Sequence, residues 1–220
     1  MKHTYLGWIA GTLGLLCFVS FSAYANETLI IVDDKGSVNE LIPKLVSGAG
    51  NAKLEENDVY KDDDDRKAAL LVEGIGNDGQ KFNQNMPGWQ YKIVEKPSRA
   101  DEFRYITFAW KKKGGSGIQL QMYGQPGGWG HRYHAGVNEK NWNPSIRVSD
   151  LPREWEVHTR DLFEDWNEFT LTGIAFTAWS LDHGIWDHVL FHQEEDDPLA
   201  DLSVDPREKA AAVWAELKAR

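Results

Sequence analysis

The sequence predicts an all-β protein, an antiparallel jelly-roll β-sandwich with a short C-terminal helix. Short segments in which apolar and polar residues alternate recur between residues 68 and 191, and such alternation is typical of strands with one buried face. Gly, Pro, Asn and Asp separate these segments, with hardly any helical periodicity between them. That combination favours a sandwich, and an all-β barrel is the alternative architecture.

The N-terminus predicts export. A basic start precedes an apolar run over residues 6–21 that lacks acids and bases, and Ala23-Tyr24-Ala25 matches a cleavage site. We therefore expect a signal peptide over residues 1–25, cleaved after Ala25, and a periplasmic or secreted mature protein without a membrane span. Cys17 is the only cysteine, so the mature chain would contain no disulfide, zinc-cysteine site or haem-attachment motif.

The next segment, residues 26–54, is expected to be an N-terminal extension with a strand over 28–32 and a short helix over 38–46. An acidic run follows over residues 55–66, EENDVYKDDDDR. It reads as a solvated loop, or else as part of a structural calcium site, because calcium takes carboxylate and carbonyl oxygens clustered on loops. Asp58 and Asp187 are the metal-ligand candidates for that alternative, and apart from a possible structural calcium no cofactor is expected.

Residues 55–192 form the predicted β-sandwich module, with strands over 68–72, 105–111, 145–148, 155–159, 169–179 and 185–191. Residues 193–220 read as an acidic linker followed by a helix. Asp205 and Pro206 resemble a helix start, with Asp as the N-cap and Pro at the first position.

Composition narrows the function. The chain holds 24 basic and 34 acidic residues, a net charge of −10, which excludes nucleic acid as a partner. It holds ten tryptophans, more than a core of this size needs. We expect Trp110, Trp155, Trp166 and Trp186 in the core, whereas Trp89 and Trp179 are left undecided.

A hairpin over residues 117–137, GIQLQMYGQPGGWGHRYHAGV, is the candidate binding element. Its glycine-rich turn, residues 124–130, presents Trp129, and polar side chains alternate along both strands. Aromatic rings stack on the apolar faces of sugars, and planar polar groups bind paired hydroxyls. The candidate ligand-binding residues are Gln119, Gln121, Tyr123, Trp129, Arg132, Tyr133, His134, Trp142 and Arg147. A basic patch formed with Lys111, Lys112 and Lys113 could add recognition of an anionic polysaccharide.

Five stretches carry a resemblance: MPGWQYKIVEKP (86–97), YITFAWKKKGG (105–115), RYHAG (132–136), PREWEVHTRDLFEDWNEFTLTGIAFT (152–177) and WDHVLF (186–191). Together they resemble a galactose-binding-like β-sandwich module of the carbohydrate-binding type, as found appended to large bacterial multidomain c-type cytochromes. The resemblance covers roughly residues 45–192. It implies the sandwich fold and a non-catalytic carbohydrate-binding role with a polysaccharide or oligosaccharide as partner.

Two other functions stay open. The segments QMY (121–123) and RYHAGV (132–137) loosely resemble motifs of jelly-roll polysaccharide lyases, which act on uronate-containing polysaccharides. That enzyme would need Gln121 or Arg147 to neutralise the uronate, His134 as base and Tyr133 as acid. A structural module whose exposed aromatic residues meet a protein partner is the third possibility.

Overall fold

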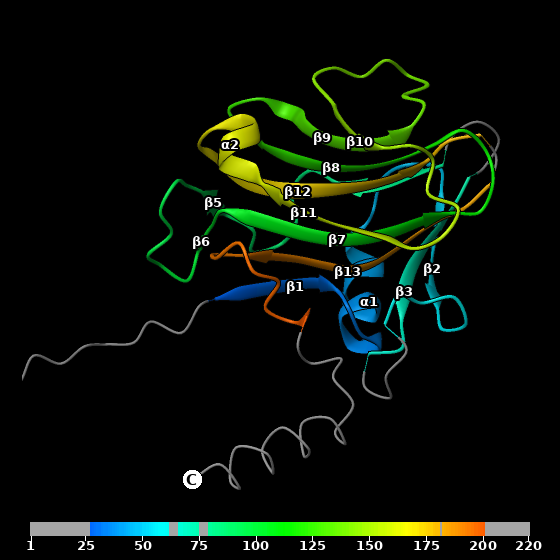
Figure 1. Cartoon of the computed structure of the whole chain (residues 1–220), viewed down its shortest axis with the longest axis horizontal. Helices are drawn as coiled ribbons and strands as arrows, with labels where there is room; N and C mark the ends of the chain where they lie inside the picture. Colours follow the sequence, from blue (N-terminus) through cyan, green and yellow to red (C-terminus); the bar gives the residue numbers. More distant parts are fainter. Residues whose placement is uncertain (1–26, 62–65, 75–78, 181, 201–220) are drawn as a thin grey trace, which may run out of the picture.

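The computed structural model describes residues 27–61, 66–74, 79–180 and 182–200. The predicted signal peptide and the predicted C-terminal helix lie outside the described residues. The predicted β-sandwich is confirmed: two sheets face each other with the large apolar side chains between them (Figure 1). Across the described part, no helix has the length and apolar character that crossing a membrane requires.

The first sheet has six strands in the order β11-β7-β13-β3-β2, and β1 also pairs with β13. All of its pairs are antiparallel. The strands are β1 (Thr28–Val32), β2 (Asn51–Glu55), β3 (Ala69–Glu73), β7 (Tyr105–Lys112), β11 (Glu156–Asp161) and β13 (Gly184–His192).

The second sheet has seven strands in the order β10-β9-β8-β12-β5-β6, with β4 also paired to β12. Two pairs run parallel, β9 with β10 and β5 with β6, and the others are antiparallel. The strands are β4 (Gln80–Asn83), β5 (Tyr91–Ile93), β6 (Glu102–Phe103), β8 (Gly117–Gln125), β9 (Gly128–Gly136), β10 (Ile146–Ser149) and β12 (Phe169–Ala178).

Two strands from the predicted N-terminal extension over residues 26–54 pair with strands of the six-stranded sheet. Strand β1 pairs with β13, with Thr28 opposite His192, and β2 pairs with β3. The partner of β1 lies at the far end of the described chain, so no local pattern could reveal the pairing. The strand itself has the predicted bounds.

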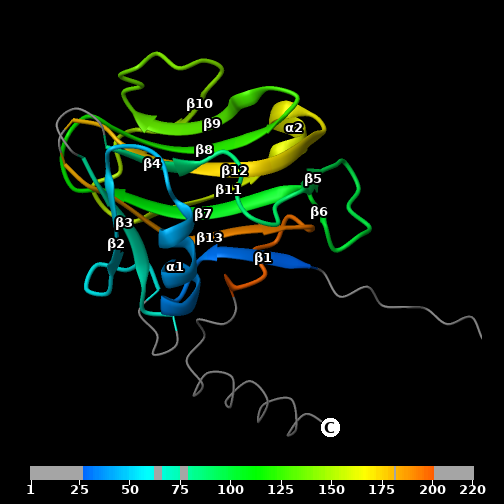
Figure 2. The same ribbon diagram turned by 180° about the vertical axis from the view of Figure 1, so that it is seen from behind.

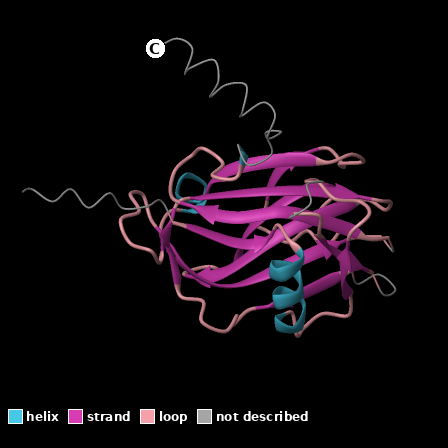
Figure 3. Ribbon diagram, turned by 90° about the horizontal axis from the view of Figure 1, so that it is seen from below, coloured by secondary structure: helices cyan, strands magenta, loops and turns pink. Residues whose placement is uncertain are grey.

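A short helix, α1 (Lys35–Leu41), begins earlier than predicted. Asp34 caps it by accepting a hydrogen bond from the Ser37 amide at 2.6 Å, while the Ser37 hydroxyl lies 3.0 Å from the Asp34 amide. A 3-10 turn, η1 (Ile42–Lys44), continues it. The helix stands beside β1 and β3 at one side of the sandwich (Figures 2 and 3). A second helix, α2 (Leu162–Trp166), precedes β12 and was not predicted.

The tryptophan predictions for the core are largely confirmed. Trp110 and Trp186 are fully buried between the sheets, whereas Trp155 and Trp166 are half-buried and pack against apolar clusters. Both undecided rings, Trp89 and Trp179, are buried. These rings supply much of the apolar area that stabilises a sandwich with no disulfide among its described residues.

The middle residue of the predicted lysine cluster, Lys112, is buried. It lies at the end of β7 on the side of Phe108 and Trp110, and its Nζ has no hydrogen-bond partner among the described residues. Burial lowers the pKa of Lys112 to about 8. An ammonium group in this position costs desolvation energy that no carboxylate offsets at close range.

Replacing Lys112 with methionine is therefore expected to stabilise the protein. The Lys112→Met variant keeps most of the side-chain volume and removes the buried ammonium, so its free energy of unfolding should rise by about 1–3 kcal/mol. Urea denaturation at neutral pH measures the change. A lower free energy of unfolding than that of the wild type would contradict the expectation.

Candidate functional site

Strand β8 divides its side chains between the core and the outer face of the seven-stranded sheet. The core members are Ile118, Leu120 and Met122, all fully buried. Successive side chains on a strand point to opposite faces. Gln119, Gln121 and Tyr123 therefore lie on the outer face, as the alternation predicts.

Strand β9 adds two more polar side chains to this face. Arg132 lies opposite Gln121 and His134 opposite Gln119 in the antiparallel register. Strands β12 and β4 extend this face on the other side of β8. Thr177 of β12 lies opposite Gln119. Phe82 of β4 lies opposite Ala175 of β12, which in turn lies opposite Gln121. We call this group the platform; its members are Phe82, Gln119, Gln121, Tyr123, Trp129, Arg132, His134 and Thr177.

The prediction that Tyr133 binds the ligand is wrong. Its ring is fully buried in the core, stacked against Phe108 with centroids 5.6 Å apart. Its hydroxyl donates to Asp165 Oδ2 at 2.6 Å, and burial together with that carboxylate raises the pKa of Tyr133. The residue follows Arg132 directly, so the alternation of the strand places it on the opposite face.

A chain of hydrogen bonds fixes the polar part of the platform. The Arg132 Nε donates to Gln121 Oε1 at 3.0 Å, and the Gln121 Nε2 donates to Thr177 Oγ1 at 2.9 Å. Gln121 is 1% exposed. Gln121 thus orients the Arg132 guanidinium through this hydrogen bond. Because Gln121 itself is buried, the prediction that it contacts the ligand directly is wrong.

The loop over residues 137–145, which joins β9 to β10, covers the other glutamine. Ser145 Oγ lies 2.8 Å from His134 Nδ1 and accepts from Gln119 Nε2 at 3.3 Å. Gln119 and His134 are both buried as a result. The expectation of direct ligand contact is therefore also wrong for Gln119. In Figure 1 this loop rises above β9 and β10 at the top of the molecule.

Trp142, from the same loop, reaches the platform through Arg132. The Arg132 guanidinium lies 5.9 Å from the centre of the Trp142 ring, and the Arg132 Nη1 donates to Pro144 O at 3.2 Å. Trp142 also contacts Trp179, with centroids 6.1 Å apart. Trp142 is half-buried, so the structure brings it to the site as predicted, held by a cation–π contact.

Trp129 lies at the start of β9, directly after the hairpin turn. Gly127 and Gly128 adopt positive φ angles of 110° and 58°, which side chains with a Cβ rarely tolerate. The Trp129 ring meets Tyr123 and Phe82 edge to face, with centroids 5.1 and 5.5 Å apart. Trp129 and Tyr123 are half-buried. No sequence pattern indicated Phe82, because only the pairing of β4 with β12 brings it to this cluster.

The charge on the platform is positive. Burial lowers the pKa of Arg132, and burial together with the Arg147 guanidinium lowers the pKa of His134. Arg147 lies on β10 beside His134 in the parallel register and is exposed, paired with Asp150 at 2.5 Å. At neutral pH the cations of the site are therefore the guanidinium groups of Arg132 and Arg147.

The three lysines do not join this site. Lys111 and Lys113 both form ion pairs with Asp58, and Lys112 is buried. Lys111 precedes the core-facing Lys112 on β7, so it points away from the core on the six-stranded sheet. The predicted basic patch with Arg132 is wrong, because the two groups lie on opposite outer faces of the sandwich.

The two metal-ligand candidates have other partners. Asp58 Oδ1 also accepts from Trp155 Nε1 at 3.0 Å; burial alone would raise the pKa of Asp58, but the lysine contacts outweigh it and lower that pKa. Asp187 is buried and accepts from the Tyr60 amide at 2.8 Å, and burial raises its pKa to about 7. Among the described residues, no group of three or more His, Cys, Asp or Glu could hold a metal ion. Asp58 and Asp187 are thus held by lysine, tryptophan and backbone donors, and calcium binding at them stays a prediction.

The lyase arrangement also fails in its geometry. His134, the expected base, lies on the outer face, whereas Tyr133, the expected acid, lies in the core. Neighbouring residues on a strand cannot both reach one substrate on one face. Acid–base chemistry through this pair is therefore excluded.

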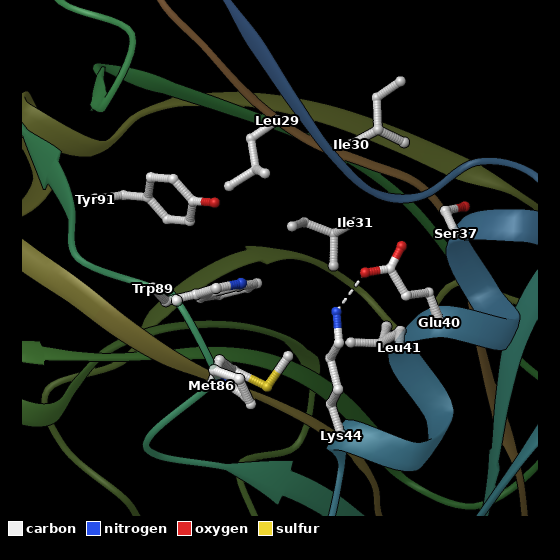
Figure 4. A pocket seen from close by; sticks show the side chains of 12 residues that line it. Leu29, Ile30, Ile31, Ser37, Glu40, Leu41, Lys44, Met86, Trp89 and Tyr91 are labelled. Carbon is white, nitrogen blue, oxygen red and sulfur yellow. Dashed lines mark hydrogen bonds and ion pairs between the residues drawn. The ribbon is translucent and has the colours of Figure 1, made fainter.

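A separate cavity of about 310 Å³ lies between β1, α1 and the segment before β5 (Figure 4). Leu29, Ile31, Met86 and Trp89 provide apolar walls, and the charged groups Glu40 and Lys44 pair with each other at 2.6 Å. Glu40 and Lys44 thus neutralise each other in this cavity, whereas Arg132 on the platform donates to neutral oxygens.

No protein-family model matches the chain, and no curated protein matches it in sequence. Solved structures similar to it include several carbohydrate-binding modules and the glycoside hydrolase domain of Endo-D from Streptococcus pneumoniae R6. A CBM29-2 module is 12% identical with a TM-score of 0.45, covering 83% of this chain and 99% of its own. CBM29_1 from Piromyces equi is 9% identical with a TM-score of 0.39, covering 69% and 83%. A family 11 module from Clostridium thermocellum is 12% identical with a TM-score of 0.35, covering 66% and 85%.

Proposed function

We propose that the protein binds a carbohydrate at the platform without changing it, and that it acts as a periplasmic or secreted protein. The observation that carries the proposal is the position of the half-buried Trp129 and Tyr123 rings beside the half-buried guanidinium of Arg132, all on one face of a sheet. This pairing of rings with a planar donor suits the two kinds of surface that a sugar presents.

The platform is built to hold its shape. Its aromatic part rests on β4, β8 and β9, and its polar part is fixed through Gln121, Thr177 and Ser145. A rigid site loses little conformational entropy on binding, so a few ring contacts and hydrogen bonds are enough for modest affinity. Trp129 and Tyr123 would stack on the sugar rings, and Arg132 would bind their polar substituents.

Retention on polysaccharide affinity gels tests the proposal. We expect retarded migration on at least one of a panel of neutral and acidic polysaccharides, with no release of unsaturated products that absorb in the near ultraviolet. Product release would identify a lyase instead. Unretarded migration on every gel of the panel would overturn the proposal and favour a protein partner.

A further inference from the structure

Arg132 differs from the other arginines near grooves in lacking an acidic partner. Arg104 binds Asp161 at 2.6 Å and Arg160 binds Asp165 at 2.7 Å. These two ion pairs line one open groove, so arginines there are neutralised even at an accessible surface. Among the described residues, no carboxylate lies within ion-pair distance of Arg132, whose protein partners are two neutral oxygens. The site thus holds a cation whose charge the protein leaves uncompensated.

The absence of a carboxylate beside Arg132 does not come from a shortage of acidic residues. The protein has 34 acidic against 24 basic residues, so carboxylates are abundant on its surface. Arg132 is half-buried, and a desolvated cation without a counter-charge raises the free energy of the folded state. A ligand that brings a negative charge would remove that cost, and it would therefore gain affinity that a neutral ligand would not.

The Arg132 guanidinium also has N–H donors left to bind a ligand. Its Nε is held by Gln121 and its Nη1 donates to Pro144 O, whereas a guanidinium carries five N–H donors. The Trp142 ring limits its movement from the loop side. Carboxylate and sulfate groups accept paired hydrogen bonds from such a fixed fork, in a geometry that single hydroxyls do not match.

The spacing from the aromatic cluster suits one sugar unit. Tyr123 follows Gln121 by two residues on the same face of β8, a separation of roughly 7 Å along a strand. Trp129 contacts Tyr123, and Arg132 contacts Gln121. A sugar stacked on the rings would therefore place a charged substituent, or that of the adjoining sugar, within reach of Arg132.

We infer that the ligand of the platform is an anionic saccharide, whose carboxylate or sulfate group binds the Arg132 guanidinium. The inference rests on the proposed carbohydrate-binding function and specifies the class of ligand. Arg147, exposed on β10 at the edge of the same face, is already paired with Asp150 at 2.5 Å, so Arg132 is the cation of this face that has no counter-charge among the described residues.

Affinity gels with matched polymers test the inference. One pair is polygalacturonate and its methyl ester, which share a backbone and differ in charge. The other is chondroitin sulfate and desulfated chondroitin, which isolates the sulfate. We expect at least about tenfold stronger retention by the charged member of one pair, and the pair concerned tells carboxylate from sulfate. Raising the salt to about 0.5 M should remove most of the difference, because salt screens a half-exposed charge pair.

Arg132→Gln should abolish the preference for the charged polymer, whereas Arg99→Gln, an exposed arginine paired with Asp101, should retain it. Near-ultraviolet circular dichroism checks the fold of each variant. If Arg132→Gln does not fold, Arg132→Lys and the salt dependence of the wild type replace it; lysine keeps the charge but not the planar fork, so a weakened preference is expected. Equal retention by both members of each pair would overturn the inference and leave the proposed function standing, whereas no retention on any polymer would overturn the proposed function.

Discussion

Replacing Trp129 with alanine is expected to weaken polysaccharide binding by at least about tenfold, which corresponds to about 1.4 kcal/mol. The ring lies at the start of β9 in T-shaped contact with Tyr123 and Phe82, so its removal takes away a large apolar surface of the platform. Stacked aromatic contacts supply binding energy through buried area and through the polarity of the ring face. Affinity electrophoresis against the polymer that retains the wild type measures the loss.

Trp155 supplies the matched control. It is likewise half-buried but lies just before β11, where it packs against Ala69, Leu71 and Ile185 of the other sheet and donates to Asp58. The Trp155→Ala variant should lose stability and retain binding. If Trp129→Ala folds and is retained as strongly as the wild type, the ligand binds elsewhere on the protein.

Replacing His188 with alanine is expected to lower the free energy of unfolding by about 3–5 kcal/mol, because it leaves a buried carboxylate unpaired. The His188 ring is fully buried, and each of its nitrogens lies 2.8 Å from a carboxylate: Nδ1 from Asp33 Oδ1 and Nε2 from Asp197 Oδ2. Asp33 follows β1 and Asp197 follows β13. The His188 imidazolium thus connects the segment after β1 and the segment after β13 to the six-stranded sheet.

A half-buried histidine provides the control for this substitution. His183 lies 3.0 Å from Asp182, and its side chain is 30% exposed. Surface ion pairs contribute little, so His183→Ala should change the free energy of unfolding by less than about 1 kcal/mol. Urea denaturation of both variants measures the difference. Equal losses would show that the buried pairs of His188 add nothing beyond those of a surface pair.

The cluster of His188, Asp33 and Asp197 predicts that the stability of the protein depends on pH. Burial alone would lower the pKa of His188, but its hydrogen bonds to Asp197 and Asp33 outweigh burial and raise that pKa above 6.5. A histidine whose folded pKa is raised stabilises the protein fully below its unfolded pKa, and this stabilisation is lost as the pH rises through the folded pKa. The stability difference between wild type and His188→Ala should therefore be largest near pH 5 and shrink above pH 7. A difference that grows with pH would contradict this account.

The candidate site shows where local pattern suffices and where it fails. Alternation along β8 correctly separated Gln121 and Tyr123 from the core residues between them. It should also have excluded Tyr133, because Tyr133 and His134 are adjacent on one strand and cannot share a face. The ligand role of Gln119 was a different error. Nothing in its own strand indicates that Ser145, 26 residues further on, covers it.

The sequence by itself determined the sheet-forming periodicity, the glycine turn before Trp129 and the excess of aromatic residues, because these depend on neighbours a few positions apart. Only the tertiary structure decided that β1 completes a sheet with β13 and that Phe82 meets Trp129. It also decided that Arg132 stands without an acid among the described residues while other arginines are paired. Such pairings join segments far apart in the chain, and burial depends on what covers a face. Local pattern encodes neither.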